Sequence, residues 1–472
     1  MVDLARWQFA TTSIYHFLFV PVTIGLGFLV ALLQTAWYRN GRPEYLRLTR
    51  FFGTLLLINV AIGVVTGLVQ EFEFGMNWAT WARYVGDVFG GPLAMEGLFA
   101  FFLESTFIGL WVFGWERLPR RVHLACIWCV SIGAALSAMF IMIANSWMQH
   151  PVGYTINHST GQPQLSNVWD LFTNGTFIWG YVHVLLASLV TGSLVMLAVS
   201  TWQLRRDPGG AGAPFRHSAR LSVIVLVPSI VLAMMVGSQL GVVETKYQPM
   251  KIAAAEAQWE TCKPCSFSAF QIGGGSNDHT PSQIIEIPHL LSLLATGSWN
   301  GEVKGLSQLQ GEYEKRYGPG NYVPDVFIQY WSMRVMAYLA SLIALFALWG
   351  AWLVHRDGLA RSRWFLRLAP WAVITPFLMN TAGWLLTENG RQPWIVQGLM
   401  KTVEGASRSV SETQVIISLT VFVLVYLLLG AADLALMLRY GRRELSGEDD
   451  HSSGGEDSPS PGGHVPVAAL TY

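Results

Sequence analysis

Residues 176–203 read TFIWGYVHVLLASLVTGSLVMLAVSTWQ, a stretch without a single Asp, Glu, Lys or Arg. A helix needs about 20 predominantly apolar residues to cross a bilayer. A membrane strand would alternate apolar and polar residues, and this stretch does not alternate. The whole chain shares this character, since 52% of its 472 residues are hydrophobic and 13% are charged, against about 25% charged in soluble domains. The composition therefore indicates a helical membrane protein.

Runs of this kind recur along the chain and predict an all-α, polytopic membrane protein with nine transmembrane helices. The runs are 11–36, 51–74, 92–115, 123–147, 176–203, 216–240, 325–354, 370–388 and 411–438. The N-terminus lacks a basic segment followed by a small-residue cleavage site, so we expect the first run to be retained.

Arginines decide the predicted orientation, because Lys and Arg concentrate in cytoplasmic connections. Among the even-numbered connections, the second holds Arg83 and the fourth holds no Lys or Arg. We therefore place the N-terminus outside and the C-terminus in the cytoplasm. The basic residues of the odd-numbered connections and of the segment after the last run are Arg39, Arg42, Arg47, Arg50, Arg117, Arg120, Arg121, Arg205, Arg206, Arg216, Arg356, Arg361, Arg363, Arg367, Arg439, Arg442 and Arg443.

Two segments lie outside this pattern and complete a division into four parts. Residues 1–240 hold the first six predicted helices and residues 325–438 the last three, with a long external loop at 241–324 between them. Loops of that size are usually functional or disordered. The remaining segment, 439–472, becomes polar and acidic, which predicts a disordered cytoplasmic tail.

The four cysteines fall into two pairs. Cys126 and Cys129 lie within an apolar run, where packing as small apolar side chains is expected. Cys262 and Cys265 form a Cys-Lys-Pro-Cys motif in the external loop. No His follows Cys265, which argues against covalent attachment of a c-type haem. A local disulfide and two free thiols are both compatible with the motif.

Four potential iron ligands share one predicted depth. The orientation places His16, His183, Met336 and Glu388, each on a different run, in the outer half of the membrane. Axial haem ligands are drawn from such residue types. Taken singly, each has a simpler explanation, such as packing for the histidines and Met336 or helix capping for Glu388. Arg334 lies at the same level and needs an anionic partner, which a haem propionate would provide.

The run at 92–115 carries two further acidic residues, Glu96 and Glu104. Eight residues along an α-helix correspond to about 800°, which leaves the two side chains about 80° apart. Carboxyl groups inside a membrane usually mark ion or proton routes. Pairing with another helix is the structural alternative.

Several motifs together resemble subunit I of cytochrome bd-type quinol oxidases, over nearly all nine predicted helices. Any one of them alone could arise by chance, but their joint order could not. They are Gln70-Glu-Phe-Glu-Phe-Gly-Met-Asn-Trp78, Gly90-Gly-Pro-Leu-Ala-Met-Glu-Gly97, Phe101-Phe-Leu-Glu-Ser-Thr106, Asn145-Ser-Trp-Met-Gln-His-Pro-Val-Gly153, Trp331-Ser-Met-Arg-Val-Met336 and Gly390-Arg-Gln-Pro-Trp394.

This resemblance implies three haems. His183 and Met336 match the two axial ligands of a six-coordinate, low-spin haem b, which suits electron transfer because no position is open to oxygen. His16 and Glu388 match the ligands of a high-spin haem b and a haem d. Which of these two residues serves which haem stays open.

Other positions acquire roles through the same resemblance. Arg334, Trp384 and Arg391 match residues near haem propionates, and a planar guanidinium suits a carboxylate. Glu96 and Glu104 match acidic residues for proton delivery near the two high-spin haems.

The external loop resembles the family's quinol-binding loop in its shorter form. Lys251 and Glu256 fall on positions linked to quinol oxidation, where a carboxylate can accept a proton released from the ring. Cys262 and Cys265 match nothing in the family pattern. The resemblance also implies a second large membrane subunit and often a small single-helix one, in a bacterial cytoplasmic membrane. No nucleic acid partner is expected.

The expected activity is that of a terminal oxidase. Quinol would be oxidised at the outer face and oxygen reduced to water with cytoplasmic protons, which generates a proton gradient without a pumping step. A non-redox transporter or channel would explain the buried charges, but it would be colourless. A cytochrome b anchor that only relays electrons would lack a centre that binds carbon monoxide.

Overall fold

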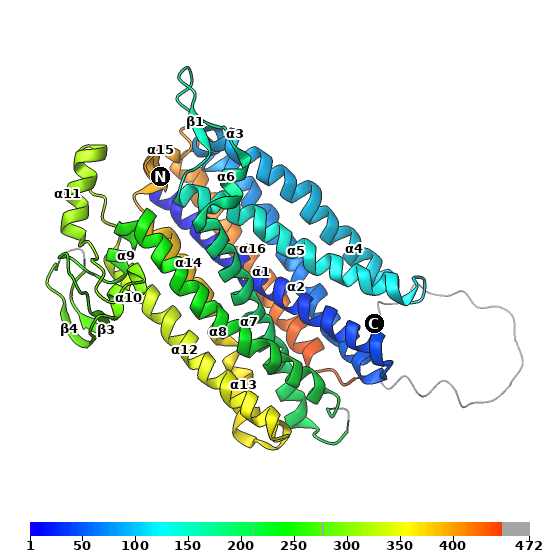
Figure 1. Ribbon diagram of the computed structural model, residues 1–472. Coiled ribbons are helices and arrows are strands. Elements are labelled where there is room, and N and C mark those ends of the chain that lie inside the picture. Colours follow the sequence, from blue (N-terminus) through cyan, green and yellow to red (C-terminus); the bar gives the residue numbers. More distant parts are fainter. Residues whose placement is uncertain (211, 276–277, 446–472) are drawn as a thin grey trace, which may run out of the picture.

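Long helices form one bundle in the computed structural model, which describes residues 1–210, 212–275 and 278–445 (Figure 1). Within the described residues, eight helical segments are long and apolar enough to cross a membrane. Seven are single α-helices and one is built from α3, η1 and α4. They are α1 (Val2–Asn40), α2 (Pro43–Met76), α3–η1–α4 (Ala79–Phe113), α5 (Arg120–Gln149), α7 (Gly175–Arg206), α8 (Phe215–Tyr247), α12 (Val326–His355) and α16 (Glu412–Gly441).

The predicted run at 370–388 coincides with two helices. These are α13 (Arg363–Ala372) and α14 (Ile374–Gly390), and α14 packs against α12. The break precedes Pro376, which has no N–H for the carbonyl of Ala372. The hydroxyl of Thr375 donates a hydrogen bond to that carbonyl at 2.6 Å instead. Because α14 has only 17 residues, a ninth membrane crossing stays a prediction.

The run predicted at 92–115 begins earlier than expected. Its helix α3 (Ala79–Met95) continues through a π-helical segment, η1 (Glu96–Phe101), into α4 (Phe102–Phe113). Gly90, Gly91 and Pro92 indicate a helix boundary, yet Pro92 lies inside α3 and is buried. Arg83, which was predicted to lie in a connection, lies within α3.

Two glycines bring α1 and α7 into backbone contact. A Cβ atom on Gly25 would lie 2.0 Å from the carbonyl oxygen of Ser188, and one on Gly192 would lie 2.3 Å from the carbonyl carbon of Gly25. Small residues commonly allow such close approach between membrane helices. His16 precedes Gly25 by nine residues and His183 precedes Gly192 by nine residues, which is about 13.5 Å along either helix. The crossing therefore places the two histidines at a common level.

The loop predicted at 241–324 is folded over its described residues, and its first residues extend α8 to Tyr247. It forms a small subdomain at the end of the bundle that holds the N-terminus (Figure 1). Strands β3 and β4 pair antiparallel, with Phe267 opposite Ile287. The elements of the subdomain are α9 (Pro249–Ala255), β3 (Phe267–Ile272), β4 (Ser282–Ile287), α10 (Leu290–Thr296) and α11 (Leu306–Tyr317).

Short elements complete the fold. Two more antiparallel hairpins lie between helices, and most of the predicted tail at 439–472 falls outside the described residues, which end at 445. The short elements are β1 (Tyr154–Ile156), β2 (Pro163–Leu165), α6 (Val168–Thr173), η2 (Leu359–Arg361), β5 (Trp394–Val396), β6 (Met400–Lys401) and α15 (Thr402–Gly405).

Candidate functional site

His16 on α1 presents one unprotonated ring nitrogen. Its Nδ1 lies 2.9 Å from the hydroxyl of Thr66 on α2. That hydroxyl donates its own hydrogen to backbone carbonyls of Ile62 and Gly63 at 3.1 and 3.0 Å, so it accepts from Nδ1–H. The lone pair of Nε2 is then available to a metal. Gly67 leaves room for the ring, because a Cβ atom there would lie 3.0 Å from its Cε1.

His183 on α7 has the same arrangement with different partners. Its Nδ1 lies 3.1 Å from the backbone oxygen of Ala233 on α8. A carbonyl can only accept, so Nδ1 carries the hydrogen and Nε2 keeps its lone pair. Gly237 is again the close neighbour, since a Cβ atom there would lie 3.1 Å from Cε1 of the ring. Metal-bound histidines are typically oriented by such hydrogen bonds from the second ring nitrogen.

Met336 lies where α12 meets α14. A Cβ atom on Gly383 of α14 would lie 3.3 Å from its sulfur. The next residue, Trp384, is half-buried and makes an edge-to-face contact with Phe17 of α1, with 5.0 Å between ring centroids. Trp384 therefore stands between the helix of Met336 and the helix of His16.

Glu388 lies in the last turn of α14, where both of its carboxylate oxygens have partners. Oε1 accepts a hydrogen bond from Nδ2 of Asn145 at 2.8 Å, and Oε2 pairs with the guanidinium of Arg391. The Arg391 side chain is 5% exposed. Its Nε and Nη1 are buried without a hydrogen-bond partner among the described residues. Unpartnered buried donors are costly, and a carboxylate such as a haem propionate would satisfy them.

Glu96 and Glu104 both lie against α5. Oε1 of Glu96 accepts a hydrogen bond from the hydroxyl of Ser137 at 2.7 Å. Gly133 lets α5 approach α4, since a Cβ atom there would lie 3.1 Å from the backbone nitrogen of Glu104. Glu96 begins the π-helical segment, so the angle of about 80° calculated for a regular α-helix does not hold across these two residues. Both side chains are half-buried.

Arg334 on α12 contacts the subdomain formed by residues of the predicted loop. Its Nη2 donates to Oε2 of Glu256 at 2.7 Å, and other donors reach the backbone oxygens of Ser268 and Ala255. Both charged side chains are buried, with exposed fractions of 1% and 4%. Burial raises the pKa of Glu256, and the Arg334 charge opposes that shift. The anionic partner that an arginine requires at this level is thus supplied by the protein itself, and a role of Arg334 toward a haem propionate stays a prediction.

Lys251 on α9 is also buried and paired. Its Nζ donates to Oε2 of Glu244 at 2.7 Å and to Oε1 of Gln149 at 2.6 Å. Burial lowers the pKa of Lys251, and the Glu244 carboxylate opposes that shift. The end of α14 passes close by, since a Cβ atom on Gly390 would lie 2.4 Å from Cγ of Lys251.

The predicted residues thus form separate groups. Lys251 is connected to Glu388 and Arg391 through side chains of α5, and Arg334 is paired with Glu256. Among the described residues, no hydrogen bond or ion pair links His16, His183 or Met336 to another predicted site residue.

Sequence reasoning missed four polar residues. Asn145 and Gln149 stand one helical turn apart in an otherwise apolar run, a signal for one polar face. Glu244 near the end of α8 gave no signal, although it pairs with Lys251. Glu73 on α2 is 1% exposed and accepts a hydrogen bond from the Thr12 hydroxyl at 2.7 Å.

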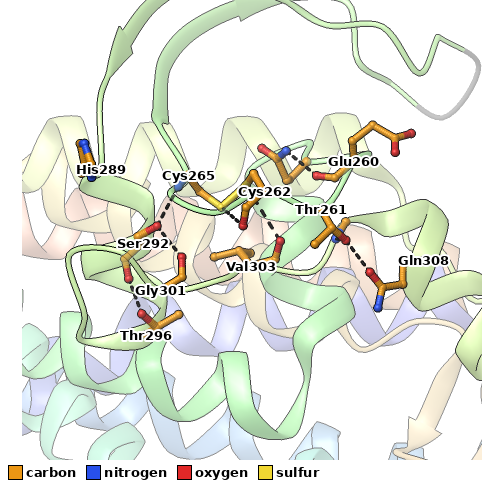
Figure 2. Close-up of a disulfide and its surroundings, with 12 residues drawn as sticks. Glu260, Thr261, Cys262, Cys265, His289, Ser292, Thr296, Gly301, Val303 and Gln308 are labelled. Atoms are coloured by element: carbon orange, nitrogen blue, oxygen red, sulfur yellow. Dashed lines mark hydrogen bonds between the residues drawn. A yellow bond between two sulfur atoms is a disulfide. The ribbon is translucent and has the colours of Figure 1, made fainter.

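Figure 2 shows that Cys262 and Cys265 form a disulfide, which decides between the two states that the motif allowed. The backbone of Cys262 is bridged to Val303, and the backbone nitrogen of Cys265 donates to the hydroxyl of Ser292 at 2.7 Å. That hydroxyl donates to the Gly301 carbonyl at 2.7 Å. The disulfide therefore closes a local ring before β3, and hydrogen bonds of its two cysteines connect this ring to α10 and to the segment after it. Cys126 is buried in the apolar core, as predicted, and Cys129 is half-buried.

The helical bundle defines a multi-span membrane protein, and comparisons with known proteins show its family. A sequence model of cytochrome bd terminal oxidase subunit I matches residues 4–445. The chain therefore belongs to the cytochrome bd oxidase subunit I family, which makes it a quinol oxidase subunit of the bacterial cell membrane.

Individual relatives agree over almost their whole length. Cytochrome bd ubiquinol oxidase subunit 1 of Bacillus subtilis (strain 168) is 42% identical over 450 residues, covering 95% of this chain and 95% of the relative. Cytochrome bd-II ubiquinol oxidase subunit 1 of Escherichia coli (strain K12) is 35% identical over 499 residues, covering 94% and 96%. The bd oxidase structure from Geobacillus thermodenitrificans matches with a TM-score of 0.84 at 28% identity, covering 93% of this chain and 98% of that one.

Proposed function

We propose that the chain is the haem-carrying catalytic subunit of a terminal quinol oxidase. The two imidazoles carry this proposal, because His16 and His183 each donate from Nδ1 and keep Nε2 free at a common depth. When bound, the haems supply electron transfer and an oxygen-binding iron. His183 and Met336 would hold the low-spin haem b, while His16 and Glu388 would serve the high-spin haem b and haem d.

The buried polar groups favour this function over the two alternatives. A non-redox transporter has no use for unprotonated imidazole nitrogens beside a thioether helix. The unpartnered donors of Arg391 fit a propionate, and a guanidinium is well suited to that contact. An electron-relaying anchor would need no oxygen-binding haem, whereas His16 and Glu388 would provide ligands beyond the pair of His183 and Met336.

Quinol oxidation belongs to the external subdomain in this proposal. Glu256 has a raised pKa because it is buried, which suits a carboxylate that accepts a proton from quinol at near-neutral pH. Lys251 lies four residues before the end of helix α9 in the same region and carries a compensating charge. The disulfide supports an external location for the subdomain, since disulfides persist in oxidising compartments.

In this proposal protons are released on one side of the membrane and taken up from the other. Each quinol releases two electrons and two protons, and the protons leave to the outside. Two quinols supply the four electrons that reduce one oxygen to two water molecules, with four protons drawn from the cytoplasm. Glu96 and Glu104 would carry those protons along α5, and this separation of charge requires no pumping step.

A partner subunit would complete the complex. The relatives are named subunit 1, and several apolar side chains of the third membrane segment are exposed, among them Leu98, Phe99 and Phe102. We propose that a second large membrane subunit covers part of such a surface, alongside lipid and a possible small single-helix subunit.

The test is an absorption spectrum of the purified complex, reduced and then exposed to carbon monoxide. Haem bands that respond to carbon monoxide are expected, together with quinol-dependent oxygen consumption. A colourless preparation would support a transporter, and coloured protein without a carbon monoxide response would support an electron-relaying anchor.

A further inference from the structure

Three hydrogen bonds connect Lys251 in the external subdomain to Glu388 at the end of α14. Nζ of Lys251 donates to Oε1 of Gln149 at 2.6 Å, and Nε2 of Gln149 donates to Oδ1 of Asn145 at 2.7 Å. Nδ2 of Asn145 then donates to Oε1 of Glu388 at 2.8 Å. Residues from three separate helices, α9, α5 and α14, thus form one continuous chain of contacts.

The two residues at the ends of this hydrogen-bond chain, Lys251 and Glu388, determine the orientation of both amides between them. An ammonium group can only donate, and a carboxylate can only accept. Gln149 must therefore turn its oxygen toward Lys251, and Asn145 must turn its N–H toward Glu388. Flipping either amide would set oxygen against oxygen on one side and N–H against N–H on the other. The chain therefore has a single orientation, from the cation to the anion.

Burial makes this orientation energetically important. Lys251 and Gln149 have exposed fractions of 3% and 4%, so water is a poor substitute for a lost partner. The backbone oxygen of Gln149 also accepts a hydrogen bond from Gln248 at 2.5 Å. Gln149 is thus held by the junction of α8 and α9 as well as by its own helix.

The charges at both ends are compensated locally. Glu244 lies 2.7 Å from Nζ of Lys251, and Arg391 pairs with the oxygen of Glu388 that Asn145 does not contact. Each carboxylate oxygen of Glu388 is therefore assigned to one donor. The Lys251 charge also acts directly on Glu388, but the orientation of the Glu388 carboxylate is connected to Lys251 by hydrogen bonds through Gln149 and Asn145.

We propose that Gln149 and Asn145 are positioning residues, which transmit the placement of Lys251 to the carboxylate of Glu388. The inference rests on the proposed function, in which Glu388 is a haem ligand and Lys251 belongs to the quinol site. Groups that orient a metal ligand typically change metal affinity or activity by about 10- to 100-fold when they are removed. The subdomain that receives quinol and the carboxylate that holds iron then behave as one unit.

The test uses the oxidised, purified complex and reads the absorption and electron paramagnetic resonance spectra of the haem bound by Glu388. Gln149→Met removes both contacts, and Gln149→Glu keeps the acceptor for Lys251 but cannot donate to Asn145 when ionised. Both variants should displace the same spectral features, with about 10- to 100-fold lower oxidase activity. Lys251→Met should give a similar displacement, and Lys251→Arg should restore the spectrum because it still donates.

Matched controls separate positioning from packing. Gln203 is a buried amide bonded to backbone oxygens of Gly441 and Arg443 at the opposite end of the bundle, so Gln203→Met should leave the spectrum unchanged. The double variant Gln149→Met/Lys251→Met should show no larger displacement than the stronger single variant, since both break one chain.

Contrary results have distinct meanings. A wild-type spectrum in both Gln149 variants, with the haem lost in Glu388→Ala, would overturn the positioning role and leave the ligand assignment intact. Retention of every haem band in Glu388→Ala would overturn the ligand assignment itself. If Gln149→Met fails to assemble, Gln149→Glu, which preserves side-chain size, decides the question.

Discussion

The buried pair between Arg334 and Glu256 offers a prediction about how the external subdomain is held to the bundle. We consider Arg334→Met, which keeps a long side chain but removes the charge and its hydrogen bonds. Glu256 would then be left as a buried carboxylate without a counter-ion, and the carbonyl of Ser268 would lose two donors at 3.2 and 2.6 Å.

The magnitude follows from burial. Removing one partner of a buried pair costs about 3–5 kcal/mol, which is about 150- to 4,000-fold in an opening equilibrium. The pair of Lys304 and Glu312 in the same subdomain is 2.8 Å apart but is 44% and 42% exposed. Exposed pairs contribute about 1 kcal/mol or less, so Lys304→Met is the control and should change little.

Hydrogen exchange of the purified complex measures the effect. Amides of α9 and β3 should exchange about 150- to 4,000-fold faster in Arg334→Met, up to the limit set by local stability, and close to the wild-type rate in Lys304→Met. The double variant Arg334→Met/Glu256→Met should recover much of the protection, because no lone charge remains. Unchanged exchange together with an altered haem spectrum would refute this reasoning and favour a propionate as the partner of Arg334.

Three further predictions address the proposed sites. His183→Ala or Met336→Ala should abolish the low-spin haem b bands and quinol oxidation, because each removes one axial ligand; optical spectra and oxygen consumption check this. Glu256→Ala should lower quinol oxidation and leave all haem spectra intact, and Glu256→Gln should remove the loss of activity at acidic pH. We expect that loss in the wild type because burial raises the pKa of Glu256, so acidification would protonate the proton acceptor. Replacing Cys262 and Cys265 by Ser should destabilise the subdomain by about 2 kcal/mol, the loop-closure value for such a short ring, as measured by proteolysis.

Each of these predictions has a control variant. Met333→Leu, one turn from Met336, should preserve the low-spin haem b bands. Glu260→Gln should preserve both the rate of quinol oxidation and its decrease at acidic pH. Cys129→Ser should leave proteolysis unchanged. Haem loss in Glu256→Ala would show that the residue is structural, and normal spectra in Met336→Ala would exclude it as a ligand.

The helices could be predicted because their apolar runs are long and uninterrupted. The prediction of 176–203 lies within Gly175–Arg206, and the polar N-cap residue Asn174 marks the start of this helix. The start of the third segment could not be predicted, since Gly90, Gly91 and Pro92 normally indicate a boundary. There Pro92 lies inside α3, and the helix continues into the π-helical segment.

Pairings between residues that are distant in the sequence could not be predicted. Arg334 was expected to need an anion, and the structure supplies Glu256 from a segment 78 residues away. Glu244 lies near the end of the apolar helix α8. A carboxylate at such a position is indistinguishable in the sequence from an ordinary residue at the membrane surface. Asn145 and Gln149 were visible within a motif, but only their contacts reveal that one oxygen must face Lys251.

The contact between Gly25 and Gly192 has a consequence for electron tunnelling. Backbone atoms, not side chains, set how far apart α1 and α7 stand. If His16 and His183 hold iron as proposed, the distance over which an electron tunnels between their haems depends little on substitutions in the surrounding side chains. Substitution of either glycine would increase that distance, and every other contact between the two helices would have to readjust.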